Sequence, residues 1–537
     1  MAYPHWKPAV LKKRMQQKAS IPKEWHLLSP VPSDVVNTKE FIDSSTLLSP
    51  EEKAITNITD ATVLLSKLAS RELSSEQVAL AFCKRAALAH QLTNCCTEMF
   101  FDRAISCAKA LDDHLRKTGK LKGPLHGLPI SIKDGFDIEG IDTTLGWVGL
   151  IGKPAPRNGC MAELLLSMGA VIYCKTNIPQ SLMMSDSYNH VFGQSLNALN
   201  RNLISGGSSG GEGAVVAAQG SIIGIGSDIG GSIRIPATLQ GLYSLTPSAG
   251  RIPWERSLNN QSHIVPPVAG PMTTSLNSLE FFTEAFISNK PWEREHRALP
   301  IPWRKELADA PAHPLKIGIV FDDGIVKPQP PVARALREVA EKFHAAGHDV
   351  IEWDTSSHVK GLKLWLKSVL ADGGAECERL CDLVDEPLIQ GMLVGQAKDR
   401  LTQLERQELD KAKHDYRTHY LRQWRESHID ALIMPVLPWV AYTPKTWVKS
   451  RQWLGYTAIF NLLDYAVVTV PVTKVDPSLD APSDEWRNHK PRNESDAFNH
   501  EQYDLELVKG MPICVQIITG RFGEERGIAV AKVMEQL

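Results

Sequence analysis

The spacing of hydrophobic residues changes along the chain and separates predicted helices from predicted strands. Before residue 125 the spacing is helical: Ser74 and Gln77 form a capping box ahead of an apolar stretch, and a second helix is predicted over residues 103–115. Gly123 and Pro124 end this region. The short apolar run that follows, residues 128–133, predicts a β-strand.

Predicted helices and short apolar strands alternate in the rest of the chain. Helices are expected at residues 161–168 and 331–346, each followed by a glycine that ends it. This alternation is typical of an α/β protein whose mixed, mostly parallel central sheet is covered by helices on both faces. Further strands are predicted at residues 171–174, 222–225, 316–320, 349–352, 431–434, 466–470 and 513–518.

The domain organisation predicted from the pattern is that of one large unit. The sequence contains no repeat of 20–50 residues, and large α/β enzymes reach 537 residues within a single domain. Two polar, proline-containing stretches, residues 288–312 and 476–501, are interpreted as excursions on the surface rather than as domain boundaries.

The composition narrows the range of partners. The 59 Lys and Arg residues nearly cancel the 61 Asp and Glu residues, for a net charge of −2, so nucleic acid and anionic membranes are not expected. No apolar run reaches the roughly 18–20 residues of a membrane-spanning helix. Residues 1–20 are basic but have no hydrophobic core, so they do not predict a secretory signal; a solvated helix is favoured over one that touches a membrane.

The nine cysteines are too few for a disulfide scaffold in a chain of this length. Cys95 and Cys96 are adjacent, and Cys377 and Cys381 are four residues apart. Neither pair has a CxxC pattern or a nearby histidine pattern suited to zinc, so we interpret them as ordinary half-buried thiols. These thiols indicate a reducing, cytoplasmic location.

Two blocks of glycine and serine between residues 133 and 251 are the strongest candidates for a binding or catalytic site. The first is residues 206–211, GGSSGG, and the second is residues 230–234, GGSIR, preceded by Asp228. Such small residues let backbone amides approach a ligand, and consecutive N–H groups can form an anion-binding nest. The blocks therefore predict either a phosphate site or the oxyanion site of an acyl-transfer enzyme.

The phosphate hypothesis is poorly supported by the motifs. Neither block is followed by Lys-Ser or Lys-Thr, so the GxxxxGK[ST] loop is absent from both, and Ile229 stands where GxGxxG requires glycine. Dinucleotide binding is disfavoured for the same reason. A structural role for the glycines, as tight turns, would suffice for one block alone.

Acyl transfer needs a nucleophile and a base, and the residues leave two hypotheses open. Residues 206–210 satisfy GxSxG, the motif of a Ser-His-Asp enzyme, but the preceding residues 197–204 resemble a loop rather than a strand, and none of the 17 histidines is placed as a base. Alternatively Lys133 ends an apolar strand, where burial disfavours the charged form of an amine. A neutral amine can accept a proton from a serine, directly or through a second serine.

Three segments together make the sequence resemble the amidase signature family. These are residues 127–134, GLPISIKD, residues 206–213, GGSSGGEG, and residues 228–237, DIGGSIRIPA, with 24 residues (232 − 208) between their serines. The likeness extends from about residue 60 to the C-terminus and includes residues 175–180, KTNIPQ. It implies the amidase signature fold for a catalytic domain of residues 59–537, with its motif core at residues 125–255, and a helical extension at residues 1–58. In its overall sequence character the chain is similar to fungal general amidases and acetamidases.

The resemblance implies a role for each residue that matches the family motif. Ser232 would be the nucleophile, Ser208 the bridging serine of a cis Gly207–Ser208 peptide, and Lys133 the terminal base, in a triad that forms a covalent acyl-enzyme. Asp228 and Arg234 would support the loop together with Ser209. The oxyanion site would use the backbone amides of Ile229, Gly230, Gly231 and Ser232, with Ser208 beside the substrate.

The implied activity is hydrolysis of a linear amide C–N bond to a carboxylate and ammonia or an amine. This mechanism uses no metal and no organic cofactor. Three alternatives remain. Glutamine-dependent amidotransferase subunits share the motifs, and hydrolases of fatty-acid amides, carbamates and esters use the same chemistry. A binding module that has the fold but has lost the activity is the third. The small-molecule amide would be the partner, and the sequence leaves a homodimer open. Residues near the motifs that could line an acyl pocket, or equally belong to the core, are Trp147, Met183, Met184 and Tyr188.

Overall fold

The computed structural model describes residues 5–27, 31–32, 34–254, 264–311, 313–449 and 453–537, and the statements below concern these residues. Residues 1–4 of the basic N-terminal segment, residue 255 at the end of the motif core and residue 312 of the first polar stretch lie outside them.

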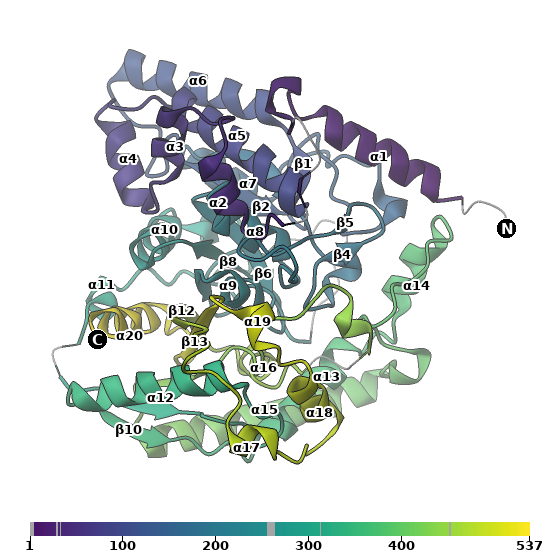
Figure 1. Cartoon of the computed structure of the whole chain (residues 1–537), viewed down its shortest axis with the longest axis vertical. Helices are drawn as coiled ribbons and strands as arrows, with labels where there is room; N and C mark the ends of the chain where they lie inside the picture. Colours follow the sequence, from purple (N-terminus) through teal and green to yellow (C-terminus); the bar gives the residue numbers. More distant parts are fainter. Residues whose placement is uncertain (1–4, 28–30, 33, 255–263, 312, 450–452) are drawn as a thin grey trace.

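An 11-stranded sheet runs through the centre of the molecule in the order β1-β3-β2-β6-β8-β7-β12-β13-β11-β9-β10 (Figure 1). A separate two-stranded hairpin pairs β4 with β5. The strands are β1 (Cys96–Met99), β2 (Pro129–Lys133), β3 (Val171–Thr176), β4 (Tyr188–Asn189), β5 (Gly193–Gln194), β6 (Ile223–Asp228), β7 (Tyr243–Thr246), β8 (Val268–Thr273), β9 (Lys316–Ile319), β10 (Asp349–Glu352), β11 (Ala431–Pro435), β12 (Val467–Lys474) and β13 (Pro512–Ile518).

The predicted α/β class and the mixed sheet are confirmed, but the expected majority of parallel pairs is not found. Of the ten pairings between described strands of the large sheet, four are parallel and six are antiparallel. The antiparallel centre arises because β8, β7, β12 and β13 each run opposite to the next strand in the sheet. The parallel pairs lie in two groups on either side of this centre.

Helices pack on both faces of the sheet. Helix α9 contacts β7, β12 and β13, whereas α10 contacts β7 and β8, and α20 contacts β12 and β13. The α-helices are α1 (Lys7–Ala19), α2 (Thr38–Ser44), α3 (Pro50–Thr56), α4 (Ala61–Ala69), α5 (Ser75–Thr93), α6 (Phe101–Thr118), α7 (Cys160–Ser167), α8 (Gly210–Ala217), α9 (Arg234–Gln240), α10 (Leu276–Ser288), α11 (Lys305–Ala308), α12 (Pro330–Ala345), α13 (His358–Val369), α14 (Ala375–Asp382), α15 (Gln403–Ser427), α16 (Ala458–Leu463), α17 (Asp484–Arg487), α18 (Glu494–Glu501), α19 (Leu505–Val508) and α20 (Glu524–Gln536). Short 3₁₀ turns are η1 (Lys23–Trp25), η2 (Val148–Leu150), η3 (Gln180–Leu182), η4 (Pro291–Glu293), η5 (Ala397–Asp399) and η6 (Thr446–Lys449).

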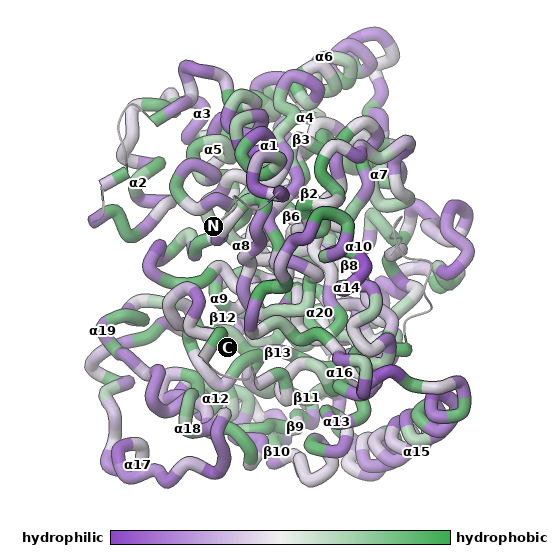
Figure 2. The backbone as a smooth tube through the Cα atoms, turned by 90° about the vertical axis from the view of Figure 1, so that its right-hand side faces the viewer, coloured by the Kyte–Doolittle hydropathy of each residue, from purple (hydrophilic) through white to green (hydrophobic). Residues whose placement is uncertain are grey.

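Hydrophobic positions concentrate along the sheet, as Figure 2 shows, while the outer helix α15 is largely hydrophilic. Every residue of β2, β3 and β13 is buried. In β3 and β13 this burial accounts for the mainly apolar runs, whereas β2 alternates Ile130 and Ile132 with the buried polar residues Ser131 and Lys133. The capping box of Ser74 and Gln77 starts α5 as predicted. All the strands and helices predicted above are present, with their ends displaced by a few residues.

The helices of the first 58 residues pack onto the body of the chain around a buried arginine. Arg85 of α5 is fully buried; it donates hydrogen bonds to Thr56 and Asn57, and lies 2.9 Å from Asp43. Lys13 of α1 donates to Asp142 at 2.8 Å. These contacts attach α1, α2 and α3 to the rest of the fold.

No helix among the described residues is both long enough and apolar enough to cross a membrane. This agrees with the absence of an apolar run of membrane-spanning length in the sequence.

The close packing of β8 against β7 generates a stability prediction. A Cβ atom at Gly270 would lie 2.0 Å from the backbone oxygen of Leu245, which cannot move without displacing β7. We expect Gly270→Ala to lower the free energy of unfolding by about 1–3 kcal/mol, the usual cost of overpacking a core, measured by urea denaturation.

The matched control is Gly520→Ala, because a Cβ atom there meets nothing within 4 Å and the backbone needs no left-handed conformation. Equal urea midpoints for Gly270→Ala and Gly520→Ala would contradict the packing described here.

Candidate active site

Lys133 ends β2 with its side chain completely buried. Its Nζ donates hydrogen bonds to Ser208 Oγ at 2.8 Å and to Ser227 Oγ at 2.9 Å, and lies 3.4 Å from the Ser227 carbonyl oxygen. The parallel pairing of β2 with β6 places Ser227 at the same end of the sheet as Lys133. The carboxyl ends of adjacent parallel strands are a common place for a ligand site in α/β sheets. Ser227 was not singled out from the sequence, where nothing but its place before Asp228 distinguishes it.

Ser208 lies in the turn that leads into α8, and the predicted cis Gly207–Ser208 peptide bond is present. Its hydroxyl faces Lys133, and the next residue, Ser209, donates its backbone N–H to the Ser232 carbonyl oxygen at 3.2 Å. The turn therefore brings Lys133, Ser208 and the backbone of Ser232 into one region of the structure.

Gly210 and Gly211 of the first block pack closely against other segments of the chain. A Cβ atom at Gly211 would lie 2.2 Å from the Cys95 carbonyl oxygen. The backbone N–H groups of Gly210 and Gly211 already donate to Ser187 Oγ and to the Asn177 carbonyl oxygen. These two amides are therefore committed to acceptors within the protein.

Asp228 and Arg234 brace the loop that carries the second block. The Asp228 carboxylate accepts hydrogen bonds from the backbone N–H groups of Gly231 and Ile233, and from the Arg234 guanidinium at 3.0 and 3.1 Å. Burial opposes ionisation of Asp228, but the Arg234 charge and these donors outweigh it and hold the pKa of that carboxyl well below its usual range. Arg234 also donates to Asn461, so the loop is fixed to α16.

The amides predicted for an oxyanion site are not equivalent. The Gly231 N–H donates to Asp228 at 2.7 Å, so it is committed to bracing the loop. Within the described chain, the backbone N–H groups of Ile229, Gly230 and Ser232 have no protein acceptor. Three of the four predicted amides therefore make no hydrogen bond to another described residue.

Glu212 is a buried acid that the sequence analysis did not identify. It lies on α8, accepts hydrogen bonds from the Ser131 hydroxyl and from Thr176 Oγ1 at 2.5 Å, and is completely buried. Burial raises the pKa of Glu212 to about 8, although both hydroxyl donors act in the opposite direction. Its only sequence signal is its position four residues after Ser208.

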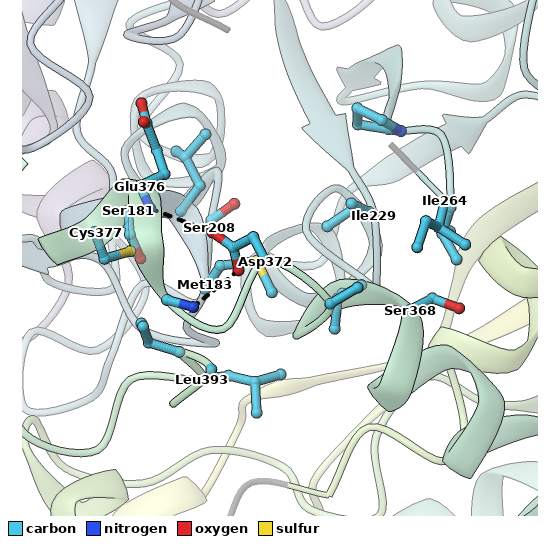
Figure 3. A pocket seen from close by; sticks show the side chains of 18 of the residues that line it. Ser181, Met183, Ser208, Ile229, Ile264, Ser368, Asp372, Glu376, Cys377 and Leu393 are labelled. Carbon is cyan, nitrogen blue, oxygen red and sulfur yellow. Dashed lines mark hydrogen bonds between the residues drawn. The ribbon is translucent and has the colours of Figure 1, made fainter. Parts of the chain in front are cut away.

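A cavity of about 170 Å³ opens beside these residues (Figure 3). Ser208, Ser227 and Ser232 line it, and no lining residue among those described is a histidine. The hypothesis of a Ser-His-Asp triad therefore gains no support from the site, whereas Lys133 directly contacts Ser208. Among the described residues, the charged members of the cavity lining are Asp372, Glu376 and Arg406, and the apolar part includes Trp147, Leu182, Met183, Ile229, Trp254, Ile264, Val265, Leu380 and Leu393.

Two of the four residues proposed for an acyl pocket line this cavity. Trp147 and Met183 do, whereas Met184 and Tyr188 belong to a different hydrophobic cluster together with Leu203 and Ile204. For Met184 and Tyr188 the alternative interpretation, that they are part of the core, is the correct one.

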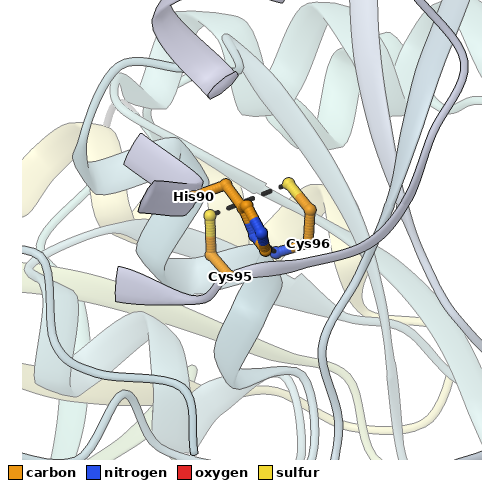
Figure 4. Close-up of side chains that lie close together, drawn as sticks. All are labelled: His90, Cys95 and Cys96. Carbon is orange, nitrogen blue, oxygen red and sulfur yellow. Dashed lines mark hydrogen bonds between the residues drawn. The ribbon is translucent and has the colours of Figure 1, made fainter. Parts of the chain in front are cut away.

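A second group of side chains, His90, Cys95 and Cys96, places possible metal ligands within 4.8 Å of one another (Figure 4). The sequence analysis did not recognise His90 as a neighbour, and both thiols are fully buried rather than half-buried. The Cys96 backbone N–H donates to His90 Nδ1 at 3.2 Å, and burial raises the pKa of the Cys95 thiol well above its ordinary value. Zinc binding requires thiolates, so this cluster fits neutral structural thiols better than a metal site. All nine cysteines are free thiols.

Comparison with known proteins identifies similar chains along the whole length. The family model described as Amidase matches residues 77–527. An acetamidase of Emericella nidulans is 37% identical over 550 aligned positions, covering 99% of this chain and 98% of the relative, and an acetamidase of Aspergillus oryzae is 36% identical with the same coverage. A solved structure of a fatty acid amide hydrolase matches with a TM-score of 0.92 and 35% identity, covering 99% of this chain and 95% of that one.

The buried acid beside Lys133 gives a prediction about pH and stability. Because the pKa of Glu212 is raised from 4.5 to about 8 on folding, its contribution to stability is full below about pH 4.5 and is lost as the pH rises through 8. We expect Glu212→Gln, which imitates the neutral acid, to reduce the loss of stability between pH 5 and pH 8, measured from urea midpoints across that range.

The exposed residue Glu501 supplies the control, since Glu501→Gln should follow the pH dependence of the unmodified chain. If Glu212→Gln shows the same pH dependence of stability as the unmodified chain, the fold does not hold Glu212 in its neutral form.

Proposed function

Because this chain belongs to the amidase signature family and is a hydrolase of amides, we propose that it cleaves carboxylic amides through an acyl-enzyme on Ser232, with Ser208 and Lys133 as a proton relay. The observation that carries the proposal is the 2.8 Å contact between Lys133 Nζ and Ser208 Oγ on a cavity that Ser232 shares. The products are a carboxylate and ammonia or an amine.

The surroundings of Lys133 favour a neutral amine whose lone pair faces Ser208. A neutral amine has two hydrogens and one lone pair. Ser227 offers two acceptors, its Oγ at 2.9 Å and its carbonyl oxygen at 3.4 Å, which suit the two hydrogens. With its lone pair directed at the hydroxyl hydrogen of Ser208, whose Oγ lies 2.8 Å away, Lys133 can receive through Ser208 a proton from Ser232.

The chemical steps follow from this arrangement. Ser232 Oγ attacks the carbonyl carbon as its proton moves to Ser208 and the Ser208 proton moves to Lys133. The amides of Ile229, Gly230 and Ser232 donate to the negatively charged oxygen of the tetrahedral intermediate. Lys133 returns the proton through Ser208 to the leaving nitrogen as the C–N bond breaks. Water then attacks the acyl-enzyme and gives up a proton to the same relay. The relay returns that proton to Ser232 Oγ as the acyl bond breaks, and the released carboxylic acid ionises to the carboxylate.

The proposal assigns supporting roles to the rest of the predicted set. Asp228 and Arg234 hold the loop, Ser209 fixes the turn to Ser232, and Gly231 orients the oxyanion amides through its bond to Asp228. We also propose that residues 59–537 are the catalytic domain and residues 1–58 a helical extension. The mechanism uses side chains and backbone amides of this chain alone.

Three activities of this kind differ in substrate: hydrolysis of long-chain amides, hydrolysis of short-chain amides, and transfer of ammonia from glutamine. A fatty-acid-amide hydrolase is favoured by the structural match at a TM-score of 0.92, whereas the full-length similarity to two acetamidases favours a short acyl group. A glutamine-dependent amidotransferase subunit would depend on a second protein. Ammonia release by the purified chain from acetamide, benzamide and a long-chain primary amide separates the three: a dependent subunit should turn over none of them, and the preferred acyl length selects between the other two.

The nucleophile is tested by covalent labelling. A serine-directed fluorophosphonate should label Ser232, and Ser232→Ala should lose both labelling and amide hydrolysis, as read by mass spectrometry of the labelled peptide. Ser368→Ala is the matched control: Ser368 lines the same cavity, but its hydroxyl donates to the Leu364 carbonyl oxygen of its own helix. Labelling that persists in Ser232→Ala would place the nucleophile elsewhere.

The base is tested by its removal. Lys133→Ala should reduce the acylation rate by more than about 10², the usual size of a lost general base, in stopped-flow measurements of acyl-enzyme formation. Lys13→Ala removes another buried lysine, one that does not line the cavity, and should leave the acylation rate close to that of the unmodified chain. A near-normal rate in Lys133→Ala would exclude the relay.

A further inference from the structure

Helix α8 carries a completely buried carboxyl group that the steps of the proposed relay do not use. Glu212 lies in the first turn of this helix, four residues after Ser208. Its two oxygens are hydrogen-bonded to the Ser131 hydroxyl of β2 and to Thr176 Oγ1 of β3, the latter at 2.5 Å. One carboxyl group therefore joins the start of α8 to two strands of the sheet.

Both strand residues are immediate neighbours of the proposed base. Ser131 precedes Lys133 by two residues on β2, and the side chains of both reach the segment that contains Ser208 and Glu212. Thr176 is the residue of β3 that is paired with Lys133 in the parallel register of the two strands. The carboxyl group is thus attached to the sheet directly beside the lysine.

The third strand at this point, β6, leaves space for the contact. Gly224 is paired with Ser131, and a Cβ atom at Gly224 would lie 2.4 Å from Glu212 Oε1. Two residues further along, a Cβ atom at Gly226 would lie 3.0 Å from Ser209 Oγ. Glycine in a strand often marks such a close approach of another segment. The start of α8 therefore lies directly on the sheet.

Two other contacts hold the turn before α8, but they lead to different strands. Ser209 Oγ lies 3.3 Å from both the backbone N–H nitrogen and the carbonyl oxygen of Ser227 on β6. The Gly211 N–H donates to the Asn177 carbonyl oxygen, just after β3, at 2.9 Å. Neither contact reaches β2, the strand that ends in Lys133. The carboxyl contact described above is what connects α8 to that strand.

The two hydroxyl partners suit the neutral form of the acid. Burial raises the pKa of Glu212 to about 8, so the group is largely protonated near neutral pH. Either hydroxyl can accept from the single O–H of the neutral acid while the other donates to its second oxygen. A glutamine side chain has a similar shape and also offers a donor and an acceptor. Glu212→Gln therefore keeps both links, whereas Glu212→Ala removes both.

We propose that Glu212 is a positioning residue of the hydrolysis, which keeps Ser208 Oγ within hydrogen-bond distance of Lys133 Nζ. It does so by holding the start of α8 against β2 and β3 through its two hydroxyl partners. The proposal rests on the proposed function, because it takes Ser208 and Lys133 to be a proton relay, which requires that distance. Glu212 is not among the described residues that line the cavity. Its loss should therefore slow the chemical step and leave substrate binding unchanged.

The first test compares the acylation rates of Glu212→Ala and Glu212→Gln, measured by stopped flow together with KM. Glu212→Ala should reduce the acylation rate about 10²-fold, the loss that a displacement of about 1 Å can cause, with little change in KM. Glu212→Gln should retain most of the rate of the unmodified chain. A normal rate in Glu212→Ala, or a loss in Glu212→Gln as large as that in Glu212→Ala, would contradict the proposal.

Thr176→Val provides a second variant should Glu212→Ala fold poorly. It removes one of the two hydroxyls with little change in shape, so the acylation rate should fall in the same direction but by less. Thr283→Val is the matched control, because Thr283 is also completely buried and its Oγ1 donates to the Leu279 carbonyl oxygen of its own helix. Its rate should equal that of the unmodified chain. A Thr176→Val rate equal to that of the control would count against the positioning role.

A double-mutant cycle separates this proposal from the proposed function. Lys133→Ala leaves no base to position, so adding Glu212→Ala to it should change the remaining rate much less than it changes the rate of the unmodified chain. Equal losses in the two backgrounds would show that Glu212 acts independently of Lys133 and would overturn the positioning role alone. A near-normal rate in Lys133→Ala by itself would instead contradict the proposed function.

Discussion

The complete burial of the Lys133 amine is the constraint on which the arrangement of the site depends. A buried amine is tolerated only where its hydrogens and lone pair find partners, and here the partners come from β6 and from the turn before α8. The parallel register of β2 and β6 sets the position of Ser227, and the turn must bring Ser208 within 3 Å of the same nitrogen. Lys133 thus joins the sheet to the turn, through Ser227 of β6 and Ser208 before α8.

Close packing around that group explains the unusual composition of the segment. The glycines of helix α8 lie against neighbouring segments: a Cβ atom at Gly211 would overlap the Cys95 carbonyl oxygen, and one at Gly210 would lie 2.4 Å from Ser205 Oγ. Gly224 leaves room for Glu212, whose Oε1 would lie 2.4 Å from a Cβ atom at that position. The second block differs, because its loop is braced through Asp228, while the backbone N–H groups of Gly230 and Ser232 have no acceptor among the described residues.

The sequence predicted the apolar strands well because burial on both faces makes them continuous hydrophobic runs. It did not predict β8, whose Gly270 and Pro271 are unfavourable in a central strand, or α8, whose glycines have low helix propensity. Lys133, Ser208 and Ser232 could be named through motifs and spacing. The involvement of Ser227 and Glu212 depends on contacts between segments that only the folded chain brings together, and no local pattern marks them.

The account depends most directly on the protonation state of Lys133, which nuclear magnetic resonance of ¹⁵Nζ-labelled lysine reports. The resonance that disappears in Lys133→Arg would be assigned to Lys133 and observed at the pH where the protein hydrolyses amides. The account predicts the chemical shift of an uncharged amine that responds to Ser208→Ala. A shift characteristic of an ammonium ion, unchanged in that variant, would contradict a lysine that accepts the proton of a serine.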